Sequence, residues 1–88
     1  MDAVKKKKFK SDAHHLKPVV MIGQSGLTDA VIAEIELALD CHELIKVKIR
    51  AERDERKEIC NKICLTTKAE LVQSIGQIII IYRLNPKK

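Results

Sequence analysis

Residues 18–33 hold the pattern that most restricts how this chain can fold. An apolar run at 19–22 leads into Gly23-Gln24-Ser25-Gly26, and Leu27-Thr28-Asp29 then opens an amphipathic segment. This order predicts a strand, a tight turn and the start of a helix, because Thr28 can cap a helix and Asp29 suits its positive end. Backbone N–H groups beside glycines that lack a Cβ can also seat a phosphate. An ordinary strand-to-helix turn accounts for the same spacing equally well.

Length and composition indicate one domain with an aliphatic core. The chain has 88 residues, which suits a single domain that buries ~60–65% of the surface of its unfolded chain. Hydrophobic residues make up 45% and charged residues 33%, a balance that favours folding over disorder. Phe9 and Tyr82 are the only aromatic residues. Stacking of bases on a platform of several rings is therefore excluded as the main mode of nucleic-acid recognition.

The charge balance favours a polyanionic partner or high solubility. Lys and Arg number 17 against 12 Asp and Glu, so the net charge is +5 and the sequence pI is about 9.2. No apolar run approaches the ~18–20 residues of a membrane span, and the first residues lack the apolar core of a signal peptide. Cys41, Cys60 and Cys64 form no extracellular disulfide pattern. We therefore expect a cytoplasmic protein with reduced thiols and no membrane partner.

The first 17 residues predict a short basic helix. Phe9, Ala13 and Leu16 fall at i, i+4 and i+7, which gives one thin apolar stripe beneath a lysine-rich outer face. Six lysines carry the charge: Lys5, Lys6, Lys7, Lys8, Lys10 and Lys17. They are expected either to contact a polyanion or only to solubilise a frayed tail. Pro18 ends this helix and begins the first strand.

The second predicted helix, residues 28–42, has one apolar and one acidic face. The apolar stripe comprises Val31, Ile32, Ile35, Ala38 and Leu39. Leu37 falls opposite this stripe and is predicted to be exposed. The acidic side chains are Asp29, Glu34, Glu36 and Asp40. Because this face repels phosphates, any nucleic-acid binding is assigned to other surfaces.

Residues 44–50 give the clearest strand pattern in the chain. Ile45, Val47 and Ile49 alternate strictly with three cations, which are Lys46, Lys48 and Arg50. If helices cover the apolar face, the cations form a ladder with a spacing of ~7 Å on the opposite face. Such a ladder suits a polyanion, although a solvated sheet face with no partner gives the same pattern.

The remaining residues predict a third helix and a hairpin. Asp54 is the expected N-cap of the helix, whose inner stripe comprises Ile59, Cys60, Ile63 and Thr67, with Cys64 on its flank. Buried free cysteines that pack as small hydrophobes are favoured over a metal site, because no recognised spacing supplies further ligands. Residues 71–74 and 78–82 predict two strands that are joined by residues 75–77 and pair as an antiparallel hairpin.

The element order is therefore α-β-α-β-α-β-β, an α+β domain with a four-stranded mixed sheet packed with helices. In this order stand four motifs: Ala13-His14 with Leu16-Lys17-Pro18; Ile22-Gly23-Gln24-Ser25-Gly26-Leu27-Thr28; His42-Glu43-Leu44-Ile45-Lys46-Val47-Lys48; and Ile75-Gly76 with Ile81-Tyr82-Arg83. Together they resemble the CRM domain, the RNA-binding module of chloroplast splicing factors and of bacterial YhbY-type ribosome maturation proteins. The motifs span nearly the whole chain.

The resemblance implies RNA binding through the GxxG loop, as in KH domains, and association with the precursor of the large ribosomal subunit. It implies no catalysis. We also expect no cofactor. The chain departs from the family where a basic residue is usual, at Gln24, Ser25 and Gln77, and where an apolar residue is usual, at Asp12. Neighbouring cations and backbone N–H groups are then left to bind the phosphates.

We therefore expect a monomeric RNA-binding ribosome-assembly factor whose partners are large-subunit rRNA, or its precursor, and the pre-ribosomal particle. The predicted RNA contacts are Gly23, Gln24, Ser25, Gly26, Thr28, Lys46, Lys48, Arg50, Lys17 and Lys10. The expected organisation is a basic segment at 1–10 leading into the first helix, the domain at 11–84 and a basic tail at 85–88. The alternative is a protein-interaction adaptor that docks through its acidic helix and Leu37. No catalytic constellation is apparent from spacing.

Overall fold

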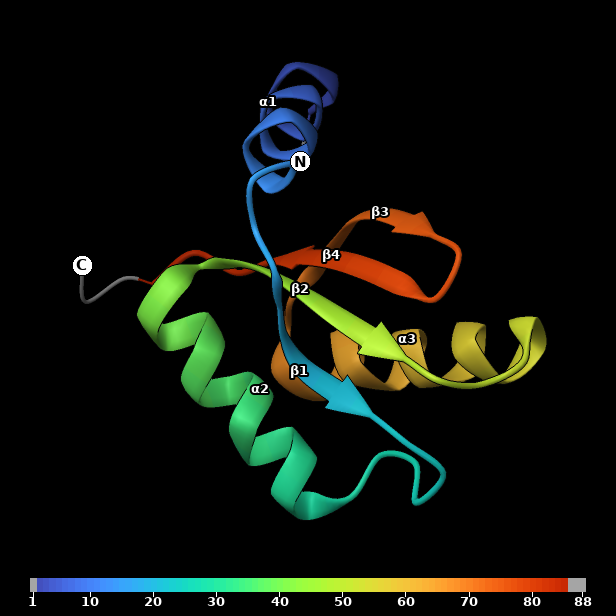
Figure 1. The fold of residues 1–88 in the computed structure, drawn as a ribbon. Coiled ribbons are helices and arrows are strands. Elements are labelled where there is room, and N and C mark those ends of the chain that lie inside the picture. Colours follow the sequence, from blue (N-terminus) through green and yellow to red (C-terminus); the bar gives the residue numbers. More distant parts are fainter. Residues whose placement is uncertain (1, 86–88) are drawn as a thin grey trace.

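The helices and strands follow the predicted order (Figure 1). The computed structural model describes residues 2–85. Its elements are α1 (Ala3–Ala13), β1 (Pro18–Ile22), α2 (Asp29–His42), β2 (Leu44–Ile49), α3 (Arg53–Thr67), β3 (Glu70–Ile75) and β4 (Ile78–Tyr82). Of the predicted basic tail, only Asn85 falls within the described residues. No helix in residues 2–85 is long and apolar enough to cross a membrane.

The strands form one mixed sheet in the order β1-β2-β4-β3. β1 and β2 are parallel and are connected through α2, while β4 is antiparallel to both of its neighbours. The parallel pair and the terminal hairpin were both predicted, and both are confirmed. β4 is an interior strand, and its sequence is apolar on both faces because each face is covered over at least part of its length.

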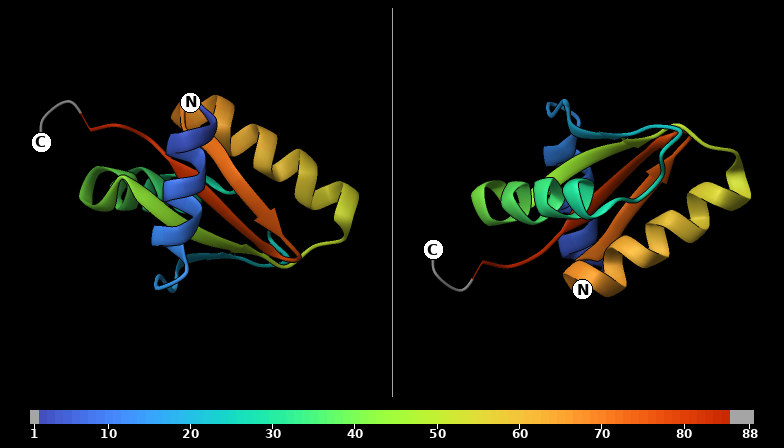
Figure 2. Two further views of the ribbon diagram at one scale, coloured as in Figure 1. Left: turned by 90° about the horizontal axis from the view of Figure 1, so that it is seen from above. Right: turned by 90° about the horizontal axis from the view of Figure 1, so that it is seen from below.

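The main core lies between the sheet and helices α2 and α3, which cover the same face (Figures 1 and 2). The alternation in β2 directs Ile45, Val47 and Ile49 into this core, where at most 1% of each residue is exposed. The helices contribute the stripes that their sequences predicted, including Ile35, Leu39, Ile59, Cys60 and Ile63. Burial of this aliphatic set is the main source of stability for the fold.

Helix α1 packs on the other face of the sheet and makes a smaller, second core. Ala13 is fully buried there against Val72 and Ile80. The rings of Phe9 and Tyr82 stack with their centroids 4.3 Å apart and their planes at 24°. Seen from above, α1 crosses the strands near the end where β2 begins and β4 ends (Figure 2). The outer face is therefore covered at that end and open toward the β3–β4 turn.

Three predicted details were wrong. Leu16 leaves the apolar stripe of the first helix, because turn-type hydrogen bonds end α1 at Ala13, and its side chain is exposed. The third helix begins earlier than expected, with Glu52 rather than Asp54 at the N-cap, because the N–H of Arg56 donates to the carbonyl of Glu52 at 2.8 Å. The second strand ends at Ile49, so Arg50 lies just outside it.

The basic N-terminal segment is helical from Ala3 onward, and it therefore belongs to the first helix rather than preceding it. The carboxylate of Asp2 caps this helix by accepting a hydrogen bond from the N–H of Lys5 at 2.8 Å. The lysines from Lys5 to Lys8 are exposed along α1. Their charge is thereby carried on an ordered element that packs on the sheet.

Candidate nucleic-acid interface

The Gly23–Gly26 loop is an exposed tight turn between β1 and α2. The N–H of Gly26 donates to the carbonyl of Gly23 at 3.1 Å, which closes the turn. Gly26 has a φ of +73°, a left-handed conformation that favours glycine. A Cβ built at Gly23 or Gly26 would meet no atom within 4 Å. The backbone of this loop is thus bare on its outer side and accessible to another molecule.

The start of α2 presents backbone donors next to this loop. Thr28 is the N-cap, as predicted, and its hydroxyl accepts from the N–H of Val31 at 3.2 Å. The N–H groups of Asp29 and Ala30 have no hydrogen-bond partner within residues 2–85. Leu27 is half-buried against the main core and holds the loop in place. The turn therefore combines a fixed position with free donors, which is the arrangement that an anion requires.

Strand ends and turns from three parts of the chain meet beside the loop. The N–H of Arg50 donates to the carbonyl of Ile22 at 2.9 Å, and the N–H of Ile49 donates to the carbonyl of Gln77 at 2.7 Å. The β1–α2 loop, the segment before α3 and the β3–β4 turn consequently lie at the same end of the molecule (Figures 1 and 2). This end of the sheet is the one that α1 leaves open.

Lys46 and Lys48 lie on the outer face of the sheet, opposite the main core. The register pairs Lys48 with Met21 on one side and with Ile78 on the other, and Ile78 pairs with Ile75. Met21 and Ile75 are about half exposed. The open end of the sheet thus presents a lysine within a row of apolar side chains, whereas Lys46 lies one step closer to α1. Of the predicted ladder of three cations, two lie on the strand itself.

The predicted contact residues fall into two groups. Gly23, Gln24, Ser25, Gly26 and Thr28 form the loop and the helix start, and Arg50 and Lys48 lie at the same end of the sheet. Lys17 immediately precedes β1 at its opposite end, and the five residues of that strand separate it from the loop by ~16 Å. Lys10 lies in the last turn of α1. The structure therefore joins the loop to the sheet cations and places Lys10 and Lys17 apart from it.

Neither aromatic ring is free to stack on a base. Phe9, on α1, and Tyr82, on β4, stack on each other, and both are half-buried between the helix and the sheet. The composition predicted that stacking is not the main mode of recognition, and the use of both rings inside the second core agrees with that prediction. Recognition by this surface must rest on backbone donors, cations and aliphatic side chains.

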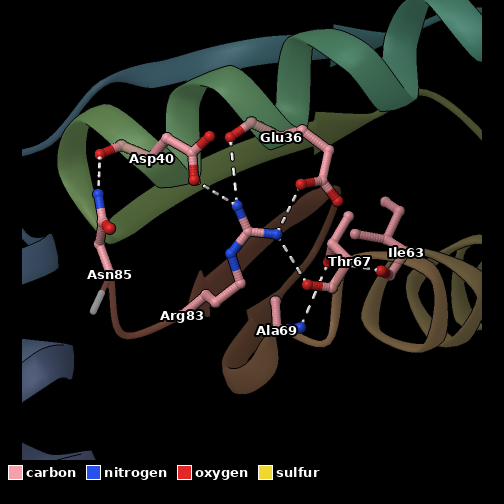
Figure 3. A network of polar contacts seen from close by, with 7 residues as sticks. All are labelled: Glu36, Asp40, Ile63, Thr67, Ala69, Arg83 and Asn85. Carbon is pink, nitrogen blue, oxygen red and sulfur yellow. Dashed lines mark hydrogen bonds and ion pairs between the residues drawn. The ribbon is translucent and has the colours of Figure 1, made fainter. Parts of the chain in front are cut away.

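Arg83 is a structural cation that the sequence did not identify as such (Figure 3). Its guanidinium donates from Nη1 to Oε2 of Glu36 at 2.7 Å and to the carbonyl of Thr67 at 2.8 Å, and from Nη2 to Oδ1 of Asp40 at 2.8 Å. Asn85 extends the network by donating from its side chain to the carbonyl of Asp40 at 2.7 Å. These contacts fasten the segment after β4 to α2 and to the end of α3. The sequence did contain one indication of this network, because Glu36 and Asp40 are one helical turn apart on a single face of α2.

The thiols of Cys60 and Cys64 interact with each other one turn apart on α3. Hydrogen bonding from Cys60 lowers the pKa of the Cys64 thiol to about 7, although burial opposes this effect, and the same pairing with burial raises the pKa of Cys60. Within the part of the chain that the structure describes, no three His, Cys, Asp or Glu side chains gather as a metal site. Cys60 is thus the donor of the pair, and Cys64, at the edge of the main core, is the more acidic thiol.

The acidity of Cys64 predicts a distinct pH dependence of alkylation. In a Cys41→Ser background, the rate of reaction of Cys64 with iodoacetamide should rise with pH around a midpoint near 7, because the thiolate is the nucleophile. Replacement of Cys60 by Val removes the hydrogen-bond donor at nearly constant volume. The midpoint should then move up toward the usual value of 9.0. An unchanged midpoint, measured by mass spectrometry, would show that Cys60 does not donate to Cys64.

Comparison with known proteins decides the family. A model of the CRS1/YhbY (CRM) domain matches residues 1–83. The chain belongs to the CRM domain family. CRM-domain proteins of the YhbY type are RNA-binding proteins and not enzymes. The family resemblance and the absence of catalysis that it implied are therefore confirmed by this match.

Individual relatives of this CRM domain support the same assignment. It is 53% identical over 83 residues to a probable RNA-binding protein of Pseudomonas aeruginosa, covering 93% of this chain and 80% of the relative. It is 54% identical over 83 residues to an RNA-binding protein of Haemophilus influenzae, covering 92% and 84%. The solution structure of a candidate RNA-binding protein from Staphylococcus aureus superposes with a TM-score of 0.83 at 35% identity, covering 96% of this chain and 88% of that one. The α+β fold of this CRM domain is thereby confirmed.

Proposed function

We propose that this CRM domain binds RNA in precursors of the large ribosomal subunit and assists their assembly. The observation that carries the proposal is the bare turn at Gly23–Gly26, which sits beside the free N–H groups of Asp29 and Ala30 and next to Arg50. A phosphate seated there accepts backbone hydrogen bonds, and these contacts position the strand without reading its sequence. The protein acts as a monomer in the cytoplasm.

Long-range attraction comes from the cations around the loop. Lys48 and Arg50 supply positive charge at the open end of the sheet, Lys46 adds charge one step closer to α1, and the lysines of α1 extend that charge across the outer face. Neutralising phosphates releases counterions from the RNA, so this part of the affinity falls as salt rises. Lys10, in the last turn of α1, and Lys17, just before β1, lie apart from the loop and bind a more distant part of the same RNA.

The alternative function as a protein-interaction adaptor has less support. Two of the four acidic side chains on α2, those of Glu36 and Asp40, are engaged by Arg83. The acidic face is therefore partly neutralised from within the chain. Leu37 is exposed, as predicted, but single exposed apolar residues are common on protein surfaces.

Crosslinking in cells tests the ribosomal assignment. After ultraviolet crosslinking and purification of the tagged protein, the bound RNA should be dominated by large-subunit rRNA and its unprocessed ends. The protein should also sediment with large-subunit precursors, and ribonuclease treatment should release it to the top of the gradient. Crosslinks that merely follow RNA abundance would contradict the proposal. Co-sedimentation that persists after complete RNA digestion would favour the adaptor instead.

A further inference from the structure

A cleft that the sequence did not reveal opens between α3 and the β3–β4 hairpin. It has a volume of about 650 Å³, and its helix wall carries Arg53, Arg56 and Lys57. Ser74 and Gly76 form the opposite wall at the end of the hairpin. In the view from below, α3 runs alongside β3, the edge strand of the sheet that lies farthest from β1 (Figure 2). This cleft is separate from the Gly23–Gly26 loop and from the outer face with Lys46 and Lys48.

The charge of the cleft suits a phosphate. Three cations line it against one carboxylate, that of Asp54, which leaves two net positive charges. Arg56 is fixed in place, because its Nη1 donates to the carbonyl of Ala51 at 2.7 Å. Arg53 and Lys57 are exposed, and neither forms an ion pair within residues 2–85. Their charges are therefore available to a ligand, and the hydroxyl of Ser74 adds a neutral hydrogen-bonding group.

The cleft lies at the same end of the molecule as the loop. Gly76 lines the cleft, and the carbonyl of the next residue, Gln77, accepts from the N–H of Ile49 at 2.7 Å. Arg50 follows and bonds to Ile22, the residue before the loop. From β1 to β3 there are three strand spacings, or ~14 Å, which equals about four nucleotides at the ~3.4 Å rise of a stacked strand. Arg50 lies between the two ends of this path.

We propose that the cleft is a second phosphate-binding subsite, occupied by the same RNA strand that the Gly23–Gly26 loop holds. The strand leaves the loop, passes Arg50 and enters between Arg53 and Lys57 on one side and Ser74 on the other. This inference rests on the proposed RNA binding, and it adds a path and a minimum length of single-stranded RNA. An RNA too short to reach from the loop to the cleft gains nothing from the cleft.

The test compares two lengths of oligouridine, which does not pair with itself. Replacing Arg53 and Lys57 with Gln should weaken binding of a 12-nucleotide RNA by about tenfold and reduce its salt slope by up to about 1.4, since each lost single-strand contact removes ~0.7. Binding of a three-nucleotide RNA should change less than about twofold. The matched control is a Lys62→Gln, Lys68→Gln variant, which loses the same charge from exposed positions on and just after α3 outside the cleft. It should bind both RNAs nearly as the parent does.

Amide chemical shifts provide the second measurement. The N–H signals of Ser74 and Gly76 should move when the 12-nucleotide RNA is added and stay in place with the three-nucleotide RNA. If uridine monophosphate alone moves them at the same concentration, the cleft is an independent nucleotide pocket, and the shared path is wrong. If the cleft variant behaves as the control does while the parent binds RNA, the cleft inference fails and the proposed function stands. If the parent binds neither RNA, both fail.

Discussion

Placing aspartate at both Gln24 and Ser25 should weaken RNA binding tenfold or more while the protein remains folded. The two carboxylates would lie on the bare turn where a phosphate is expected to sit. Like charges about 4 Å apart repel by roughly 1–4 kcal/mol at an exposed surface, and 1.4 kcal/mol corresponds to a factor of about ten. Neither residue has a positive φ, so aspartate fits the backbone there without strain. Acids near a helix N-terminus are tolerated or mildly stabilising, so the melting temperature should scarcely change.

The matched control for the loop variant carries asparagine at both positions. Asparagine has the same size and shape as aspartate but no charge. It should bind RNA within about threefold of the parent, because phosphate contacts through backbone N–H groups do not depend on those side chains. A Lys46→Gln, Lys48→Gln variant serves as a second comparison, since it should lower the salt slope by up to ~0.7 for each lost contact. A folded double-aspartate variant with the parent's affinity at one fixed salt concentration would refute the phosphate seat. The GxxG sequence would then be only the turn that joins β1 to α2.

Replacing Arg83 with Met should lower the free energy of unfolding by about 2–3 kcal/mol. The guanidinium is mostly buried, and its loss leaves the Glu36 carboxylate and the Thr67 carbonyl without a donor. Hydrogen bonds to charged groups contribute about 1.5–3 kcal/mol each, but Glu36 and especially Asp40 are partly exposed, so their share is reduced by solvent. For a domain of this size each kcal/mol lowers the melting temperature by about 4–8 °C, so we expect a fall of roughly 10–20 °C.

The control for Arg83 is Lys62→Met, which removes an exposed cation from α3 and should shift the melting temperature by less than about 3 °C. A double-mutant cycle with Glu36→Gln should give a coupling of about 1 kcal/mol between the two side chains. Below its melting temperature, the Arg83→Met variant should bind RNA as the parent does, because the guanidinium points into the fold. Normal stability combined with lost RNA binding would reverse the assignment and make Arg83 an RNA contact.

The sequence determined the order of the elements and the inner sides of β2, α2 and α3. In β2, strict alternation placed Ile45 and Val47 in the core and Lys46 and Lys48 outside it. The 3.6-residue stripes of α2 and α3 likewise predicted their buried faces. Such patterns succeed because a helix or strand fixes the direction of each side chain relative to its neighbours in the chain. The sequence also provided the turn at Gly23–Gly26 and the cap at Thr28, because both are local hydrogen-bonding features.

Only the tertiary structure decided which elements meet. The strand order β1-β2-β4-β3 brings the ends of β1 and β2 and the β3–β4 turn together, and it thereby joins the Gly23–Gly26 loop to Arg50 and to the cleft beside α3. Arg83 reaches Glu36 across 47 positions of the chain, so no local pattern shows that it is structural. α1 ends three residues before Leu16 and covers one end of the outer face, which leaves Lys48 open and sets Lys17 apart from the loop. Periodicity shows which side of an element is apolar. Which other elements pack against that side depends on how the apolar sides of all the elements are buried together.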